Sequence, residues 1–234
     1  MKFNVTGEGL VQEIDALCST TITDYPLADK TRRINTALET VISKIIKTDG
    51  TWQFDDENFT TSPTGTQDLV NGQQAYSFTD KILQIENVKI MDKNNVYQLV
   101  NPLDQRDTNG MSLESLYTVN GFPEFYDKRS NTVKFYPTPS SSLVTLTNGL
   151  KIEFKRTGSL FTVADTTKEP GFASSYHIIL AWMSALPYCK AYKPDRVPQL
   201  ERDIFTMMKE IEGFYSKREK DHIDIITTEI VNPY

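Results

Sequence analysis

The stretch LADKTRRINTALETVISKIIK, residues 27–47, decides the fold. Its apolar side chains recur every three or four residues, at Leu27, Ile34, Leu38, Val41, Ile42 and Ile45. This spacing predicts an amphipathic α-helix. Residues 173–220 show the same periodicity, and residues 7–18 predict a shorter helix. One helix cannot bury its own apolar stripe, so we expect the two ends of the chain to pack together as one helical bundle.

The middle of the chain, residues 52–163, follows a different pattern. Short alternating runs are separated by Pro, Gly, Asn and Asp, which predicts strands and turns. The predicted strands are 72–78, 82–91, 96–100, 132–136, 143–147 and 150–156, with turns at 93–95 and 127–131. The pair Asn148-Gly149 predicts a hairpin between the last two strands.

The fold class that we expect is therefore α+β. N- and C-terminal helices, residues 1–50 and 170–220, form the helical bundle, and an antiparallel β domain, a small sandwich or barrel, is inserted at residues 51–169. Pro187 lies inside the helical pattern and predicts a kink or an early end of that helix. The final helix is expected to cover about 197–220, and residues 221–234 to form an extended arm. The apolar stripe predicted for this final helix is Leu200, Ile204, Met207, Met208, Ile211, Phe214 and Tyr215.

Charge and composition narrow the function classes. The chain has 25 basic and 31 acidic residues, and its basic residues cluster only briefly, at Lys30–Arg33 and Lys217–Lys220. A nucleic-acid-binding protein usually carries a basic stripe, so sequence-specific DNA recognition is not expected. A net charge of −6 is compatible with a channel through which DNA slides without adhering.

No segment of the sequence predicts a membrane or secretory role. The first residues, MKFNVTGEGL, lack the apolar core of a signal peptide, and no apolar run is long enough to cross a bilayer. We expect the protein to remain in the cytoplasm or to leave it only inside a larger assembly.

The residues that usually perform catalysis are few. His177 and His222 are the only histidines, and each is interpreted as a packed or surface residue. Cys18 and Cys189 lie beside apolar helical positions, which indicates core thiols more than a disulfide. Neither a metal cluster nor a cofactor motif is present, so no metal and no cofactor are expected.

The acidic clusters are interpreted as solvated surface charge. Asp55–Glu57 lie in a turn-rich stretch, and Glu210 with Glu212, like Glu201 with Asp203, fits an exposed helix face. General acid–base catalysis needs two carboxylates in different environments, and no nucleophile motif accompanies these. The protein is therefore not expected to be an enzyme, and a hydrolase that uses these carboxylates is the weakest hypothesis.

Aromatic residues gather in the predicted β domain: Trp52, Phe54, Phe59, Tyr76, Phe78, Tyr97, Phe122, Phe125, Tyr126, Phe135 and Tyr136. Packing in the core of the strands is the first interpretation of this cluster. A binding module that recognises a glycan or a peptide is the alternative. The pair Met207-Met208 is likewise assigned to the core.

The C-terminal arm alternates aliphatic and polar residues after a helix has ended. Its candidate partner-binding residues are Ile223, Ile225, Ile226, Ile230, Val231 and Tyr234. A single strand leaves its backbone groups unpaired, so it has to join a sheet. Docking on a neighbouring molecule by strand addition is the favoured hypothesis, with pairing to the chain's own sheet and disorder as alternatives.

Several segments together resemble a known family. They are Thr31-Arg-Arg-Ile-Asn-Thr-Ala-Leu, Trp52, Gly72-Gln-Gln-Ala-Tyr-Ser-Phe, Tyr126, Val133-Lys-Phe-Tyr-Pro-Thr-Pro, Ile152-Glu-Phe-Lys-Arg and Pro170-Gly-Phe-Ala-Ser-Ser-Tyr-His. In this order, over residues 25–220, they resemble the head-to-tail connector, or adaptor, proteins of tailed bacteriophages.

The resemblance implies a structural protein of the virion. Members of that family form a ring, usually of twelve copies, beneath the portal protein at the capsid vertex. The ring extends the DNA channel, so that packaged DNA passes through its lumen, and it provides a docking platform for tail components. The resemblance thus implies a location at the head–tail junction, and in the host cytoplasm during assembly. It implies no catalytic residue and no contact with a membrane.

Overall fold

The structure is a computed structural model of the chain, and it describes residues 1–234 except 49–57, 59–60, 79–81, 104–118, 130 and 218–234. The chain divides into two compact units. We call Met1–Asn58 with Gly158–Tyr234 the helical unit, and Phe59–Thr157 the β unit. The described residues combine four α-helices with a curled seven-stranded sheet, so the predicted α+β class is confirmed.

Four α-helices and two short 3₁₀ turns are described in the helical unit. They are α1 (Leu10–Cys18), α2 (Leu27–Thr48), η1 (Ser174–Tyr176), α4 (Ile178–Tyr192), η2 (Pro194–Arg196) and α5 (Val197–Tyr215). The stripe predicted for residues 27–47 is buried at Ile34, Leu38, Val41, Ile42 and Ile45. The sequence therefore located both α2 and its buried face.

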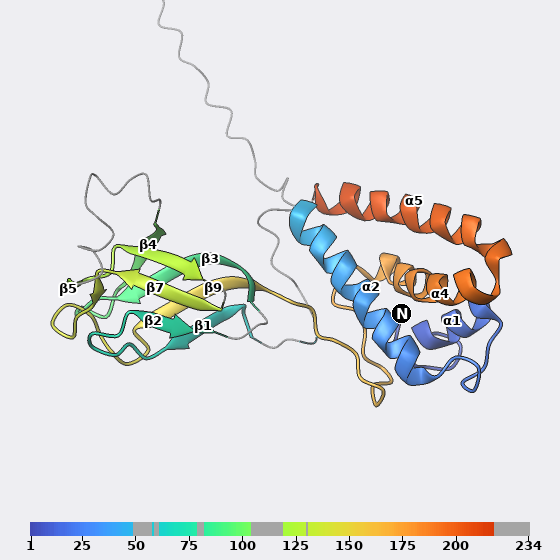
Figure 1. The fold of residues 1–234 in the computed structure, drawn as a ribbon, viewed down its shortest axis with the longest axis horizontal. Coiled ribbons are helices and arrows are strands. Elements are labelled where there is room, and N and C mark those ends of the chain that lie inside the picture. Colours follow the sequence, from blue (N-terminus) through green and yellow to red (C-terminus); the bar gives the residue numbers. More distant parts are fainter. Residues whose placement is uncertain (49–57, 59–60, 79–81, 104–118, 130, 218–234) are drawn as a thin grey trace, which may run out of the picture. The chain divides into compact units, whose positions relative to one another are not determined.

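Helix α4 is the central element of the helical unit. It contacts α1, α2 and α5, and it lies between α1 and α5 (Figure 1). Its buried side chains are distributed around the helix, at Ile179, Leu180, Ala181, Ser184, Ala185 and Cys189. A helix that is apolar on several sides is suited to such an enclosed position.

Two helix ends differ from those predicted. Of the two outcomes predicted at Pro187, a kink or an early end, the early end is wrong: α4 continues to Tyr192, because packing against three helices outweighs the one backbone hydrogen bond that a proline removes. Helix α5 ends at Tyr215, before the predicted residue 220. The N–H groups of Ser216 and Lys217 close its last turn by donating to the carbonyls of Glu212 and Phe214.

The β unit contains a single seven-stranded sheet in the order β1-β9-β3-β4-β6-β7-β2. Its strands are β1 (Thr64–Gln67), β2 (Ala75–Ser77), β3 (Ile82–Met91), β4 (Tyr97–Pro102), β6 (Phe125–Arg129), β7 (Thr132–Tyr136) and β9 (Leu150–Arg156). A separate two-stranded ladder joins β5 (Asn120–Gly121) to β8 (Thr138–Pro139). The sheet encloses one core of Leu69, Tyr76, Val88, Ile90, Val100, Val133, Phe135, Val144, Leu150 and Ile152.

The prediction of an antiparallel sandwich or barrel is corrected. The sheet is mixed, because β4 and β6 run parallel where Asn101 pairs with Phe125 and Pro102 with Tyr126. One curled sheet forms this core in place of two packed sheets, and its edge strands β1 and β2 do not pair with each other in the described residues. The long segment between β4 and β6 permits this parallel return, which a short hairpin could not.

The predicted strand 143–147 is wrong. Val144 forms only an isolated bridge with Asp92, and its N–H donates to the carbonyl of Ser140 in a turn. Asn148 adopts a left-handed backbone with φ of 50°, and a Cβ at Gly149 would lie 2.0 Å from the Thr145 carbonyl oxygen. Asn148-Gly149 therefore forms a turn that precedes β9, and it is not the loop of a hairpin between two strands.

The predicted turn at 127–131 is also shorter than expected. Strand β6 continues to Arg129, and Asp127, Lys128 and Arg129 all pair with β7. The charged residues of this segment lie in the antiparallel pair of β6 and β7, because strand positions that face solvent accept charged side chains.

Candidate functional site

The predicted partner-binding site lies entirely outside the described residues. The arm residues Ile223, Ile225, Ile226, Ile230, Val231 and Tyr234 lie outside the described residues. His222, Asp55–Glu57, Trp52, Phe54 and Phe59 lie outside them too. The candidate surfaces below come from the described part of each unit.

His177 is a structural residue in the core of the helical unit. Only 2% of its surface is exposed, and its ring packs edge-on against Phe172. Nδ1 lies 2.8 Å from the amino nitrogen of Met1, and Nε2 lies 2.7 Å from the Phe172 carbonyl oxygen. Burial lowers the pKa of His177. Both ring nitrogens are engaged in fold contacts, which supports the interpretation as a packed histidine.

Cys18 and Cys189 are both free and buried, so their interpretation as core thiols is confirmed. The Cys18 Sγ lies 3.9 Å from the carbonyl oxygen of Ala185, one helical turn before Cys189. Burial, and next the neighbouring Cys189, raise the pKa of Cys18 to about 12. A thiol that is protonated at neutral pH is not a nucleophile.

The acidic residues of α5 link helices as well as facing solvent. Glu212 forms an ion pair with Lys44 of α2, and Glu201 lies 2.9 Å from Lys190 of α4. Asp203 accepts hydrogen bonds from the Gln199 amide at 2.8 and 3.0 Å. Glu201 is exposed as predicted, and Asp203 contacts only its own helix, so the expectation of solvated charge is corrected only for the half-buried Glu212. Within the described ranges, no three His, Cys, Asp or Glu side chains gather where they could hold a metal ion.

One side of α5 faces solvent along its whole length. The buried residues of α5 are Leu200, Ile211 and Tyr215, and they lie on the other side of the helix. Glu210 and Glu212 lie at the margins of the opposite stripe. At 100° per residue, the middle of this stripe contains Arg202, Phe205, Lys209 and Gly213, and Lys217 follows in the turn just after the helix. We call these five residues the α5 outer face. Phe205 is 61% exposed, and the Lys209 Nζ lies 4.4 Å from its ring centroid.

The cations of the α5 outer face have no acidic partner among the residues that the structure describes. Arg202, Lys209 and Lys217 form no ion pair with any described residue, although other α5 residues do. An exposed aromatic ring flanked by unpaired cations is typical of a contact surface more than of a solvated helix face. The signal in the sequence was Phe205, a large apolar residue that lies off the buried stripe.

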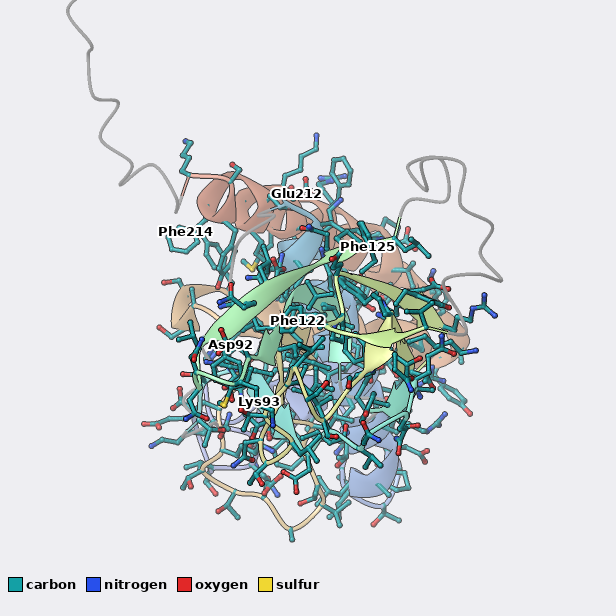
Figure 2. The ribbon with its side chains drawn as sticks, turned by 90° about the vertical axis from the view of Figure 1, so that its left-hand side faces the viewer. Asp92, Lys93, Phe122, Phe125, Glu212 and Phe214 are labelled. Atoms are coloured by element: carbon teal, nitrogen blue, oxygen red, sulfur yellow. The ribbon has the colours of Figure 1, made fainter. Side chains whose placement is uncertain are left out.

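A hollow of about 620 Å³ borders this face, lined by Tyr176, Glu210, Gly213, Phe214 and Lys217. The predicted buried stripe includes Phe214, but Phe214 is 45% exposed, and its ring centroid lies 5.5 Å from that of Tyr176 (Phe214 is labelled in Figure 2). A Cβ added to Gly213 would meet no atom within 4 Å. Packing inside the described chain therefore does not require a glycine at this helical position.

The sequence predicts that the Met207-Met208 pair lies in the core. In the structure both side chains are only half-buried.

A second face combines the α1–α2 loop with the end of α4. Ile22 is 65% exposed and Tyr192 is 71% exposed. The rings of Tyr188 and Tyr192 lie 4.8 Å apart, and Tyr188 also stacks on Tyr25 at 5.0 Å. We call Ile22, Asp24, Tyr188 and Tyr192 the loop–α4 face.

Asp24 gives the loop–α4 face its charge. Its Oδ2 accepts hydrogen bonds from the Thr21 N–H at 3.1 Å and from the Thr21 hydroxyl at 2.8 Å. These two bonds lower the pKa of Asp24 below its ordinary value, and the group is a carboxylate at neutral pH, as any exposed aspartate is. The Asp24 carboxylate is close enough to Tyr188 to raise the pKa of that phenol, after the larger effect of desolvation.

The β unit has a hollow of its own, of about 540 Å³, between β4 and the segment before β6. Asp92, Leu99, Phe122 and Phe125 are among its lining residues, and Figure 2 labels three of them. Leu99 is 57% exposed. The hollow arises because β4 and β6 pair at only two positions within the described residues.

Most other aromatic residues of the β unit are engaged in packing. Tyr76, Phe135 and Tyr136 are buried, and Phe78, Phe122 and Tyr126 pack against the core. The Tyr97 hydroxyl donates to the Asn148 carbonyl oxygen at 2.8 Å, and Lys151 lies over the Tyr97 ring. The interpretation as strand packing is therefore confirmed for these residues.

Comparison with known proteins assigns no family. No protein-family model matches the chain, and no curated protein matches it either. Among the helices of the described ranges, none is both long enough and apolar enough to cross a lipid bilayer.

Proposed function

We propose that this chain is a structural subunit of the connector between the head and the tail of a tailed bacteriophage. The observation on which the proposal depends most is the pair of exposed faces on the helical unit, the α5 outer face around Phe205 and the loop–α4 face with Tyr188 and Tyr192. Monomeric proteins seldom expose grouped aromatic side chains beside unpaired charges without a partner. The resemblance of residues 25–220 to connector proteins supplies the class of assembly.

In this proposal the helices from the two ends of the chain act as one bundle that builds the body of a ring. Contacts of α4 with α1, α2 and α5 support this role. The β unit is an insertion that offers a surface to portal or tail components. The ring has about twelve copies, as the resemblance implies, and closes through contacts between unlike faces.

The ring extends the DNA channel and does not read DNA sequence. An overall charge of −6 and scattered basic residues support passage of DNA without tight adhesion. The subunit works at the head–tail junction of the virion, and in the host cytoplasm during assembly. The role requires no catalysis, no cofactor and no membrane.

The C-terminal arm is assigned to partner binding. Residues 221–234, with Ile223, Ile225, Ile226, Ile230, Val231 and Tyr234, add a strand to a neighbouring molecule, and the portal protein is the expected acceptor. Their alternating aliphatic and polar order supports an edge-strand role.

Co-sedimentation with purified portal rings tests the proposal. We expect the full chain to co-sediment with the rings, and a chain that lacks residues 221–234 to remain folded but to stay in the supernatant. A full chain that does not bind the portal contradicts the proposed function. A truncated chain that binds as well as the full chain contradicts only the role of the arm.

A glycan- or peptide-binding module is the second candidate. The hollow lined by Leu99, Phe122 and Phe125 is the observation that favours it. Binding of a glycan or peptide array by residues 52–163 alone would support this candidate. The connector proposal predicts no such binding.

A further inference from the structure

We infer that the α5 outer face of one copy packs against the loop–α4 face of a second copy of this chain. The inference rests on the proposed function and specifies the contact by which the ring closes. It commits to a second copy as the partner because the two faces complement each other in charge and in chemistry.

The α5 outer face requires an acidic and aromatic partner. Arg202 and Lys209 lie on one stripe of α5 and Lys217 follows in the turn after it, and none of the three forms an ion pair with a described acidic residue. Phe205 stands among them with most of its surface exposed. A cation beside an apolar ring binds best where a carboxylate and aromatic faces meet it together.

The loop–α4 face offers this combination. Asp24 provides a carboxylate that accepts hydrogen bonds from Thr21, and Tyr188 and Tyr192 provide adjacent aromatic rings. Ile22 adds an exposed aliphatic side chain that can pack on Phe205. The loop–α4 face therefore provides the carboxylate and the aromatic rings that the cations of the α5 outer face would contact, and an aliphatic side chain for Phe205.

The charges also select the geometry of the contact. If two copies met through the α5 outer face of each, then Arg202, Lys209 and Lys217 of one copy would lie opposite the same cations of the other copy. Like charges opposed in an interface disfavour that arrangement. A contact between unlike faces avoids the repulsion and repeats around an axis, which is the arrangement that closes a ring.

The placement of the faces permits this repetition. Helix α4 lies between α1 and α5, so the α1–α2 loop and the outer side of α5 are on different sides of the helical unit (Figure 1). One copy can therefore contact two neighbours at once, one through each face.

Gly213 gives independent support. A glycine inside a helix is unfavourable relative to alanine, and the surroundings of Gly213 leave room for a side chain. A residue without a side chain permits close approach by another backbone or a ring. The hollow beside it, between Tyr176 and Phe214, is open to receive such a group.

Charge reversal tests the contact directly. Sedimentation velocity measures self-association of the wild-type chain, of Lys209→Glu and of Asp24→Lys. We expect each single variant to associate at least ten-fold more weakly than the wild type. Mixing the two variants should restore association, because every contact in an alternating ring then joins opposite charges.

Lys47→Glu is the matched control. Lys47 is an exposed lysine on α2 that belongs to neither face, so its reversal should leave association unchanged. Circular dichroism of each variant verifies that the monomer is folded.

Three results would overturn the inference. They are a wild-type chain that does not self-associate, single reversals that have no more effect than Lys47→Glu, and a mixture of Lys209→Glu with Asp24→Lys that fails to recover. A chain that co-sediments with portal rings in spite of any of these results keeps the proposed function and loses only this contact. A chain that fails to bind portal rings loses the proposed function, whatever its self-association.

Discussion

At the scale of single residues, Lys30 shows how far the sequence can be misleading. The sequence places Lys30 in a short basic cluster, Lys30–Arg33, which suggests solvent exposure. In the structure Lys30 is fully buried, and its Nζ lies 2.5 Å from Asp15 Oδ1. Asp15 belongs to α1, so the partner that permits the burial comes from another helix. Local periodicity contains no information about such a pairing.

Replacing Lys30 should destabilise the fold. Lys30→Ala removes the buried ammonium and leaves Asp15 without its ion-pair partner, so we expect the free energy of unfolding to fall by about 3 kcal/mol. Arg32→Ala breaks the exposed pair with Asp29 and should cost less than about 0.5 kcal/mol. Urea unfolding monitored by circular dichroism measures both. Equal losses for the two variants would contradict the structural role of Lys30.

His177 should make stability depend on pH. Burial lowers its pKa in the folded state, with opposing contributions from the Phe172 carbonyl and Glu169. The unfolded chain then binds a proton more readily than the folded chain below about pH 6.5, so stability is lost as the pH falls through that region.

A His177→Gln variant isolates this contribution. We expect the wild type to lose more of its free energy of unfolding between pH 7 and pH 5 than the variant, because the variant has no group that titrates at this position. His222 is present in both proteins and cancels in the difference. Parallel slopes of stability against pH would contradict the role of His177.

At the scale of elements, the helices were predictable and the β connections were not. The stripe of α2 follows from spacing alone, because Ile34, Leu38, Val41, Ile42 and Ile45 recur on one side of the helix and all are buried. The sequence predicts the turn at Asn148-Gly149 but not its context, since both strands that β9 pairs with, β1 and β3, lie far away in sequence. Only long-range pairing distinguishes a hairpin from a turn that enters a distant sheet.

Two glycines should respond to alanine in opposite ways. Gly213→Ala fills open space in α5 and should raise the free energy of unfolding by about 0.5–1 kcal/mol. Gly149→Ala would place a Cβ 2.0 Å from the Thr145 carbonyl oxygen and should destabilise the β unit. Thermal unfolding of the two variants decides this, and destabilisation by Gly213→Ala would show that α5 is packed differently.

At the scale of the whole molecule, the chain consists of two units with separate cores. The β unit contains all described strands and its own apolar cluster. Residues 59–157 expressed alone should therefore unfold cooperatively with near-native β content. Circular dichroism during urea unfolding provides the measurement, and a fragment without a cooperative transition would show that this core needs the rest of the chain.

The candidate site was less accessible to sequence reasoning than the fold. The arm could be proposed from its alternation, whereas the α5 outer face emerged only when the exposure of Phe205 and the absence of acidic partners in the described residues were known. Whether an apolar residue in a helix is buried or presented to a partner depends on the neighbouring elements. Sequence periodicity alone assigned Phe214 to the wrong side.

The central claim is that copies of this chain form a ring between portal and tail. Electron cryomicroscopy of the phage particle at the head–tail junction tests it most directly. We predict a ring of about twelve copies beneath the portal, into which the helical unit fits with α5 at the contact between neighbouring copies. A junction in which no repeated density accommodates the helical unit would contradict the account.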